Sequence, residues 1–407
     1  MCLVELFAGA GGLALGFERA GRYDTAALYD IFEPAQRSYL DYRPEAHYEV
    51  CDAREIREKP VRSALKGRRL DGLLGGPPCQ GFSINGQRRR KDEINQLIFT
   101  YAAVVGYLKP RFLVMENVPQ LLFHPLFEPL LSRLSEDYYV THGVLNAARY
   151  GAPQTRHRLF LVAYLKEFDV VPTLPSPTHG RAGQLLYSYH LSDSASRVAL
   201  DEETAEYIFG ADPVIKRIVK RQDTQAPAAI GESLCSLVTV GDAISDLNVL
   251  ASAGAEAVPY AAPPATKYQR FLRGDLEAVA NCQGRRHAGK PLQLANELRE
   301  GGQPEVARGS KAERYFSQAY GKLHRDGLAR TITTFFQNAG SGRFFHYEQP
   351  RTLTIREAAR LQGFPDGFTF HGSLAEQMQL VGNAVPLPLG EAVARHIANE
   401  LGPVLPD

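Results

Sequence analysis

Short apolar runs alternate with helix-like segments over the first 165 residues. Five runs predict strands: Leu3 to Phe7, Ala26 to Tyr29, Leu70 to Leu74, Phe112 to Met115 and Leu159 to Ala163. Between them, residues 13–20 and 97–108 space their apolar side chains at helical intervals. Strands that alternate with helices are typical of βα units, so we predict an α/β fold around a mostly parallel sheet.

The pattern changes after about residue 170. Pro172, Pro175 and Pro177 predict a linker, and the chain from there to about residue 330 shows scattered Gly and Pro and weak periodicity. Helical signals return with Thr354, a capping residue, and with an amphipathic segment from Leu387 to Leu401. We predict a first domain over 1–170, an irregular inserted domain over 171–371 and a C-terminal return to the first domain over 372–407.

Composition excludes several classes of protein. The 407 residues are 44% hydrophobic and 22% charged, as in folded globular chains, and the formal net charge is +1. No apolar run reaches the roughly 18 residues of a membrane-spanning helix, and Met1 to Glu5 has no secretory pattern. The five cysteines are far apart and form no CxxC pair. We therefore expect a cytoplasmic protein with no metal and no membrane association.

A glycine-rich segment follows the first predicted strand, in the order Phe7, Ala8, Gly9, Ala10, Gly11, Gly12, Leu13. Glycines there let the backbone approach a ligand closely, and the start of the following helix favours polar or anionic groups. Asp30 closes the second strand, where a carboxylate can accept hydrogen bonds from a ribose, and Asp52 is placed to meet an adenine amino group. By itself this pattern fits NAD as well as S-adenosylmethionine.

A second motif follows the third predicted strand and runs Gly75, Gly76, Pro77, Pro78, Cys79, Gln80, Gly81, Phe82, Ser83. Two prolines fix the backbone directly before Cys79, which makes this cysteine a candidate nucleophile. Glu116 ends another apolar strand and is a candidate acid catalyst. Arg156 and Arg158 alternate along the chain and can anchor a developing negative charge, while His157 falls on the opposite face and is expected to be structural.

Taken in this order, the motifs resemble the cytosine-5 DNA methyltransferase family of the bacterial type. Further matching segments are Asn95 to Leu97, Tyr150 to Gln154, Arg351 to Pro365 and Gln379 to Pro386, and the resemblance covers residues 3–163 and about 328–397. It implies a Rossmann-like sheet with helices on both faces. It also implies that the irregular insert is a target-recognition domain.

The resemblance assigns a role to each candidate catalytic residue. The enzyme would flip a cytosine out of duplex DNA, attack C6 with the Cys79 thiolate and transfer a methyl group from S-adenosylmethionine to C5. Glu116 would contact N3 and the exocyclic amino group, and Arg158 would lie near O2. Arg156 would support Arg158, and Asn117 would orient the loop that carries Cys79.

The resemblance also places the cofactor. S-adenosylmethionine would lie across the glycine-rich segment, with Asp30 on the ribose, Ile31 and Leu97 against the adenine and Asn383 near the methionine end. The expected cofactor-binding residues are Phe7, Ala8, Gly9, Gly11, Gly12, Leu13, Asp30, Ile31, Asp52, Ala53, Pro78, Leu97, Asn383 and Ala384. Two positions depart from the family pattern: the ribose acid is usually a glutamate, and Phe32 stands where an acid is common.

The net charge of +1 hides local basic segments. Residues 261–330 hold 13 Lys and Arg against 7 Asp and Glu, a net charge of +6, and Gln87 to Lys91 is a basic run beside the nucleophile. The expected DNA contacts are Gln80, Ser83, Arg88, Arg89, Arg90, Arg285 and Arg286, with Lys311, Arg314 and Lys322 as further candidates. We expect a monomer that binds double-stranded DNA at the nucleoid. Its setting would be restriction-modification or phage defence, with a cognate restriction endonuclease as a candidate partner.

Three other interpretations fit part of these residues. A tRNA cytosine-5 methyltransferase would share the chemistry, but the Cys-Phe-Thr signature typical of that branch is absent and the insert here is long. A catalytically inactive DNA-binding protein would not need the complete set of catalytic residues. An NAD-dependent oxidoreductase fits the glycine-rich segment alone and leaves the Cys79 and Glu116 motifs unexplained.

Overall fold

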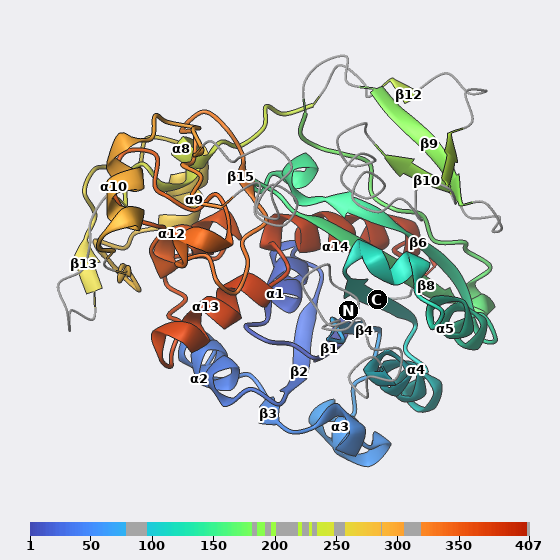
Figure 1. Cartoon of the computed structure of the whole chain (residues 1–407). Helices are drawn as coiled ribbons and strands as arrows, with labels where there is room; N and C mark the ends of the chain where they lie inside the picture. Colours follow the sequence, from blue (N-terminus) through green and yellow to red (C-terminus); the bar gives the residue numbers. More distant parts are fainter. Residues whose placement is uncertain are drawn as a thin grey trace.

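The computed structural model describes residues 1–78, 96–180, 185–191, 197–200, 219–221, 228–229, 234–247, 257–285, 287–304 and 319–404. Within these ranges a seven-stranded sheet, in the order β3-β2-β1-β4-β5-β8-β6, forms the centre of the first lobe (Figure 1). The strands are β1 (Cys2–Leu6), β2 (Asp24–Asp30), β3 (Tyr48–Val50), β4 (Gly72–Gly75), β5 (Phe112–Asn117), β6 (Tyr138–Asn146) and β8 (His157–Leu165). Only β8 runs against its neighbours, because it pairs antiparallel with both β5 and β6.

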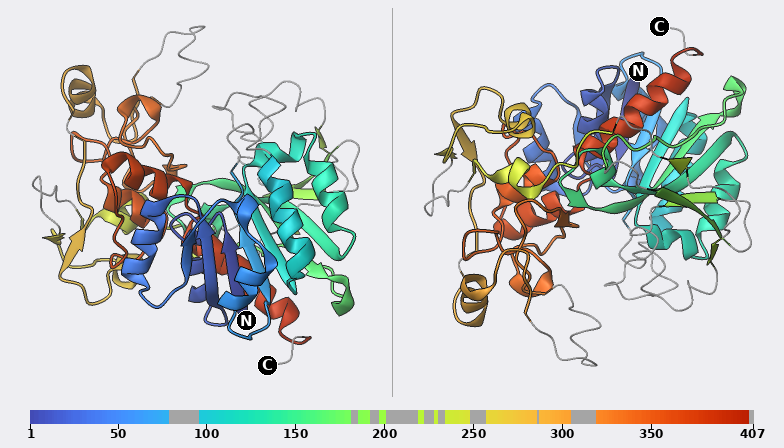
Figure 2. Two further views of the ribbon diagram at one scale, coloured as in Figure 1. Left: turned by 90° about the horizontal axis from the view of Figure 1, so that it is seen from below. Right: turned by 90° about the horizontal axis from the view of Figure 1, so that it is seen from above.

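Helices cover both faces of this sheet. The helices on one face are α1 (Gly12–Arg19), α2 (Glu33–Tyr42) and α14 (Leu387–Leu401), and those on the other are α3 (Glu58–Ala64), α4 (Leu97–Leu108) and α5 (Phe127–Leu134) (Figure 2). Successive side chains of a strand point to opposite faces of a pleated sheet. Accordingly, Val114 packs in the hydrophobic cluster with α1 and α14, and Leu113 packs in the cluster with α4 and α5. The predicted mostly parallel sheet with helices on both faces is therefore confirmed.

Tight backbone contact joins α1 to α14. A Cβ atom on Gly16 would lie 2.8 Å from the Leu387 carbonyl oxygen and 3.0 Å from the Cα of Gly390. Only a glycine at position 16 allows the two helices to approach this closely. Five strand predictions are confirmed to within about two residues at each end, and the helices over 97–108 and 387–401 begin and end as predicted. Strand β6 was not predicted.

A second lobe lies beside the sheet (Figures 1 and 2). Its described elements are α8 (Val240–Ile244), α9 (Lys267–Arg273), α10 (Lys290–Glu297), α12 (Ile355–Leu361), α13 (Leu374–Asn383), β13 (Ala257–Pro259) and β14 (Ala278–Ala280). β15 (Ala329–Arg330) joins the lobes by pairing in parallel with β7 (Gln154–Thr155).

The predicted irregular insert contains a small antiparallel sheet that the sequence pattern did not indicate. It consists of β9 (Leu185–Leu191), β10 (Arg197–Leu200), β11 (Val219–Arg221) and β12 (Ala228–Ala229), with the last three pairing with β9. Short 3-10 helices complete the described structure: η1 (Ala53–Glu55), η3 (Pro119–Phe123), η4 (Ala147–Tyr150), η5 (Lys166–Phe168) and η6 (Ala339–Ser341).

Buried charges organise the start of α12. The predicted cap at Thr354 is confirmed, since its hydroxyl accepts from the Glu357 N–H and the Glu357 carboxylate accepts from the Thr354 N–H. Arg351 binds both carboxylate oxygens of Glu357 at 2.7 Å. Burial alone would raise the pKa of Glu357, but the charges of Arg351 and His346 and these hydrogen bonds lower the pKa to about 2.

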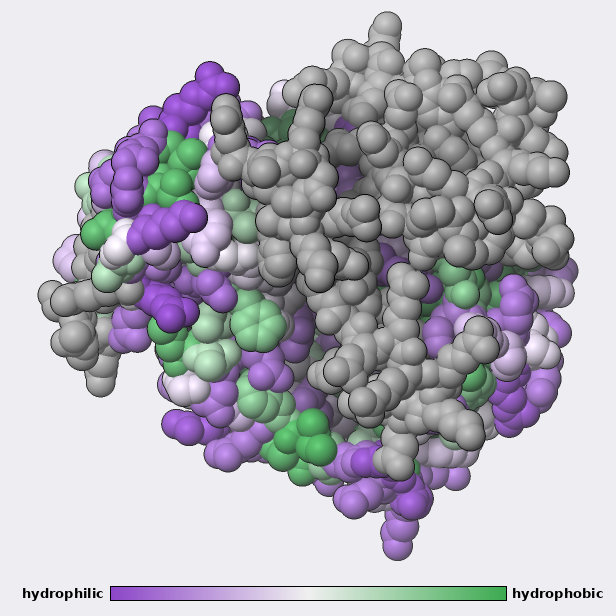
Figure 3. All heavy atoms as spheres, in the orientation of Figure 1, coloured by the Kyte–Doolittle hydropathy of each residue, from purple (hydrophilic) through white to green (hydrophobic). Residues whose placement is uncertain are grey.

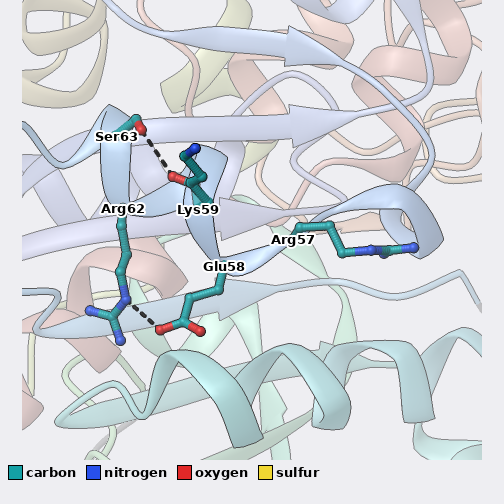
Figure 4. Close-up of a pocket in the computed structure, with 5 residues that line it drawn as sticks. All are labelled: Arg57, Glu58, Lys59, Arg62 and Ser63. Atoms are coloured by element: carbon teal, nitrogen blue, oxygen red, sulfur yellow. Dashed lines mark hydrogen bonds and ion pairs between the residues drawn. The ribbon is translucent and has the colours of Figure 1, made fainter.

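The described surface in one view mixes hydrophobic and hydrophilic residues. In the view of Figure 3, hydrophobic residues form small separate patches among hydrophilic ones. A shallow hollow lies over α3 and is lined by Arg57, Glu58, Lys59, Arg62 and Ser63 (Figure 4). It is made by the solvent-facing side chains of one short helix and carries an exposed ion pair between Arg62 and Glu58. Within the described residues, no helix is long and apolar enough to cross a membrane.

Arg360 provides a test of how the second lobe is held together. Its guanidinium is fully buried and pairs with Asp246 at 2.6 Å and with Asp366 at 2.6 Å. We expect Arg360→Leu to lower the free energy of unfolding by about 3–5 kcal/mol, because it removes the nearest cation from two buried carboxylates. Urea unfolding measures this loss. Arg62→Leu, which removes only the exposed pair with Glu58, should cost less than about 0.5 kcal/mol, and equal losses in the two variants would contradict the assignment.

Candidate active site

The chain after β1 forms a tight turn that leaves open space in front of Gly9. Phe7, Gly9 and Gly11 have positive φ angles of 56°, 52° and 71°. A Cβ atom on Gly11 would overlap the Tyr39 ring, and one on Gly12 would lie 2.6 Å from the Val385 carbonyl oxygen. Among the described residues, apart from the two chain neighbours of Gly9, no heavy atom lies within 4 Å of the position that a Cβ on Gly9 would take. Gly11 and Gly12 thus allow close packing of the turn, whereas the space beside Gly9 can hold a ligand.

Asp30 braces this turn from the end of β2. Its carboxylate accepts hydrogen bonds from the Gly9 N–H at 2.8 Å and the Phe32 N–H at 2.9 Å. Burial raises the pKa of Asp30, and the backbone hydrogen bonds partly offset this effect. The next side chain, Ile31, is 70% exposed, which is unusual for isoleucine. A carboxylate and an exposed apolar side chain thus stand together beside the open turn.

Asp52 has a cationic partner in the structure. Its carboxylate caps η1 by accepting from the Arg54 N–H at 2.9 Å and forms an ion pair with the Arg54 guanidinium at 2.6 Å. Hydrogen bonding to Arg54 lowers the pKa of Asp52. Ala53 begins the 3-10 helix that Asp52 caps. The expected contact between Asp52 and adenine remains a prediction.

Glu116 and Arg158 meet at the ends of two neighbouring strands. Glu116 lies opposite Phe160 in the antiparallel β5–β8 pair, and Arg158 is two residues earlier in β8 on the same side. The Arg158 Nε lies 2.9 Å from the Glu116 Oε1, and both side chains are mostly buried. Glu116 Oε2 would lie 3.4 Å from a Cβ on Gly76, so this ion pair stands beside the loop that leads to Cys79.

Asn117 holds the start of the same loop. Its Nδ2 donates to the Pro77 carbonyl oxygen at 3.1 Å, and its Oδ1 accepts from the Val118 N–H at 2.9 Å. Its expected role in orienting the loop that carries Cys79 remains a prediction. Cys79 itself lies outside the described residues, as do Gln80, Ser83, Arg88, Arg89, Arg90, Arg286, Lys311 and Arg314.

Arg156 and Arg158 have different surroundings, although they alternate in the sequence. Arg156 is buried, and its Nη1 donates to the carbonyl oxygens of Ile332 at 2.9 Å and Gly382 at 3.0 Å. These contacts tie β8 to two segments that are distant in the sequence. The expected support of Arg158 by Arg156 remains a prediction, and His157, which was expected to be structural, is buried.

Gln154 is a positioning residue that received no role from the sequence. Its side chain is completely buried, donates to the Leu361 carbonyl oxygen at 2.7 Å and accepts from the Ile332 N–H at 3.2 Å. The sequence shows that Gln154 belongs to the Gln-x-Arg-x-Arg motif. It does not show the hydrogen-bond partners of Gln154, because they lie about 200 residues away in the chain.

The remaining candidate residues fall into three environments. Ala8, Leu13 and Ala384 are buried, Leu97 and Pro78 are partly buried, and Asn383 and Arg285 are exposed. Lys322 does not fit a role in contacting DNA, because it is 7% exposed and its Nζ donates to the Ala295 carbonyl oxygen at 3.0 Å. In the described part of the chain, no three His, Cys, Asp or Glu side chains gather as metal ligands.

The fold and the site together define a class of enzyme. A parallel sheet with a glycine-rich turn after β1 and an acid ending β2 is the arrangement that binds adenosine cofactors. The chain belongs to the family of C-5 cytosine-specific DNA methylases, whose model matches residues 1–399. The protein is a DNA (cytosine-5-)-methyltransferase, and its methyl donor is S-adenosylmethionine.

Similar proteins span nearly the whole chain. Over 98% of its length, the chain is 29% identical to the type II methyltransferase M.AgeI of Thalassovita gelatinovora and covers 99% of that protein. It is 30% identical over 98% of its length to the type II methyltransferase M.XorII of Xanthomonas oryzae pv. oryzae, covering 84% of it. A crystal structure from an E. coli prophage, assigned as a DNA modification methyltransferase, shares the fold with a TM-score of 0.70 over 99% of both chains at 22% identity.

The described residues fit S-adenosylmethionine. The open space at Gly9 admits a ligand against the backbone, the Asp30 carboxylate stands where a ribose can be bound, and the exposed Ile31 offers an apolar contact for an adenine. The departure from the usual glutamate leaves this arrangement intact, because the shorter Asp30 still reaches the Gly9 N–H.

Gly9 therefore offers a sharp test of the cofactor site. We expect Gly9→Ala to remain folded, with about 1–3 kcal/mol of backbone strain, and to bind S-adenosylmethionine at least about 10-fold more weakly because the methyl group fills the open space. Calorimetric titration measures the affinity, and thermal unfolding measures the strain. Gly21→Ala is the matched control, since Gly21 also has a positive φ and no neighbour within 4 Å. Equal affinities in the two variants would contradict this placement of the cofactor.

Proposed function

We propose that Cys79, Glu116 and Arg158 carry the methyl transfer in this enzyme. The supporting observation is the buried Glu116–Arg158 pair beside Gly76, at the base of a loop that Asn117 holds through Pro77. A carboxyl and a guanidinium at adjacent strand ends can bind the two polar edges of one cytosine. Glu116 takes the N3 and amino edge, and Arg158 takes O2.

The chemistry follows from this placement. C5 of cytosine is a poor nucleophile, so the Cys79 thiolate first adds to C6, and the electrons of the C5–C6 double bond move toward N3 and O2. A proton shared from Glu116 at N3 and the charge of Arg158 at O2 stabilise the adduct. S-adenosylmethionine supplies the methyl group that C5 then receives. A water takes the C5 proton, the C5–C6 double bond re-forms as the Cys79 thiolate leaves C6, and N3 returns its proton to Glu116.

The cofactor-binding set is proposed on the same grounds. Residues 7–13 form the turn, and Asp30 binds the ribose. Ile31, Asp52, Ala53 and Leu97 surround the adenine. Pro78, Asn383 and Ala384 approach the methionine end. The role of Asn383 is supported by the contacts of Arg156, which binds the carbonyl oxygens of Gly382 and Asn383 and so holds this end of α13 beside β8.

We further propose the division of the chain into a catalytic domain over 1–170, a target-recognition domain over 171–371 and a C-terminal return over 372–407. The net charge of +6 over 261–330 and the exposed Arg285 support DNA contact by the second part. The basic run Gln87 to Lys91, which lies outside the described residues, would contact phosphates of the DNA.

The names of the relatives suggest the setting. M.AgeI and M.XorII are named type II methyltransferases, so we propose a restriction-modification or related phage-defence role, with a cognate endonuclease that cleaves the same site. The enzyme acts as a monomer where the chromosome lies, in the cytoplasm at the nucleoid. Bisulfite sequencing of DNA from cells that express it would reveal the methylated site. Methylation of tRNA alone would instead support the RNA-modifying alternative.

The role of Cys79 is tested by covalent trapping. Duplex DNA with 5-fluorocytosine at the target should form a covalent adduct with the enzyme, because fluorine at C5 cannot leave as a proton does. We expect Cys79→Ser to abolish the adduct and methylation while DNA binding persists. Cys235→Ser, which changes an exposed free cysteine, should leave both unchanged. Normal methylation by Cys79→Ser would overturn the mechanism, and denaturing electrophoresis reads the adduct directly.

The DNA-binding role of Arg285 is tested by salt dependence. If Arg285 contacts a phosphate, Arg285→Gln should reduce the slope of log Kd against log salt by about 1. Arg57→Gln is the control, because Arg57 is exposed on the hollow of Figure 4 and bonds only nearby carbonyl oxygens. An unchanged slope for Arg285→Gln, measured by fluorescence anisotropy, would remove Arg285 from the interface.

A further inference from the structure

The carbonyl oxygen of Gly9 is held by the hydroxyl group of Tyr48. The Tyr48 Oη donates to this oxygen at 2.7 Å, although the two residues are 39 positions apart in the chain. The N–H of Gly9 donates to the Asp30 carboxylate at 2.8 Å. Two side chains from neighbouring strands thus bind both polar groups of the Gly9 main chain. Neither side chain occupies the space where a Cβ on Gly9 would lie.

Gly9 needs such contacts because a glycine selects no single backbone conformation by itself. Its φ of 52° lies in the left-handed region, which glycine adopts about as readily as the right-handed one. Without further contacts, the turn would sample several shapes, and only some of them would leave room for a ligand. Hydrogen bonds to both the N–H and the carbonyl oxygen select one orientation of the main chain. Less conformational entropy is then lost when a ligand binds.

Several contacts fix Tyr48 on β3, which is the edge strand of the sheet. Tyr48 lies opposite Leu28 in the parallel β2–β3 pair, and it is only 5% exposed. Its carbonyl oxygen accepts from the Gln36 Nε2 of α2 at 2.6 Å, and its ring centroid lies 5.8 Å from that of Tyr39. The Tyr39 ring in turn fills the space beside Gly11. The two tyrosines therefore support two glycines of the same turn.

We propose that Tyr48 is a positioning residue of the S-adenosylmethionine site. Its hydroxyl group holds the main chain of Gly9 in the orientation that keeps the adjacent space open, so the cofactor meets a turn that is already formed. The strand that carries Tyr48 leads directly to Asp52 and Ala53, the proposed adenine contacts. One short edge strand thus serves both parts of the cofactor site. This role rests on the proposed placement of the cofactor at residues 7–13.

The variant Tyr48→Phe tests this role, because it removes the hydroxyl group and keeps the ring. Loss of one such hydrogen bond should raise the Kd for S-adenosylmethionine by about 3- to 10-fold in calorimetric titration. The Kd for S-adenosylhomocysteine should rise by the same factor, since Tyr48 acts on the turn and not on the transferred methyl group. In steady-state assays on duplex DNA, the loss should appear in the KM for S-adenosylmethionine and not in kcat.

Tyr23→Phe is the matched control. Tyr23 is also buried, at 7% exposure, and its hydroxyl group donates to a main-chain carbonyl oxygen, that of Ala394 in α14, at the same 2.7 Å. Urea unfolding measures the stability that each variant loses with its hydrogen bond. Only Tyr48→Phe should bind the cofactor more weakly and exchange the amide hydrogens of residues 7–13 faster in the cofactor-free protein. Unchanged affinity in Tyr48→Phe, or an equal loss in Tyr23→Phe, would overturn the inference.

The result for Gly9→Ala separates this inference from the cofactor placement on which it rests. If Gly9→Ala binds S-adenosylmethionine as tightly as Gly21→Ala does, the cofactor does not lie at this turn, and both proposals fail. If Gly9→Ala binds weakly and Tyr48→Phe binds normally, the placement stands and only the role of Tyr48 fails. Weak binding by both variants, with normal binding by Tyr23→Phe, is the expected result.

Discussion

Two buried side chains on the short β7–β8 segment hold the lobes of this enzyme together. Gln154 and Arg156 donate to main-chain carbonyl oxygens at Ile332, Leu361 and Gly382, and each of these partners lies in a different part of the C-terminal chain. Buried carbonyl groups need donors, and an arginine can satisfy several at once because its guanidinium is planar and always charged. These hydrogen bonds consequently fix the positions of the second lobe and the end of α13 relative to the strand that bears Arg158.

The Glu116–Arg158 pair depends on this frame for its geometry. Glu116 and Arg158 come from antiparallel neighbours, so the register of β5 against β8 sets the distance between the carboxylate and the guanidinium. A slip of one residue would turn one of them to the opposite face. Asn117 adds the link to the preceding strand through Pro77. Three adjacent strand ends thus converge on one small volume.

Local sequence patterns predicted much of the structure. Apolar runs located β1, β2, β4, β5 and β8, and the glycine-rich turn and the Thr354 cap were visible because their chemistry is confined to a few neighbouring residues. Long-range contacts were not predictable in the same way. The burial of Lys322 depends on α10, to which its ammonium group donates, and the support given by Arg156 depends on residues more than 170 positions away. Neither the periodicity of apolar residues nor the spacing of motifs indicates which distant residues a side chain will contact.

The contact between α1 and α14 bears on how the protein is made. Residues of α1 bury their apolar side against α14 in one cluster that includes Leu13, Phe17, Val393 and Ile397. During synthesis, α1 leaves the ribosome long before residues 387–401 exist, and at ordinary translation rates the interval is tens of seconds. The face of the sheet that α14 covers stays exposed throughout that time. Completion of this cluster, and with it of the sheet's cover on that face, therefore waits until the last helix has emerged.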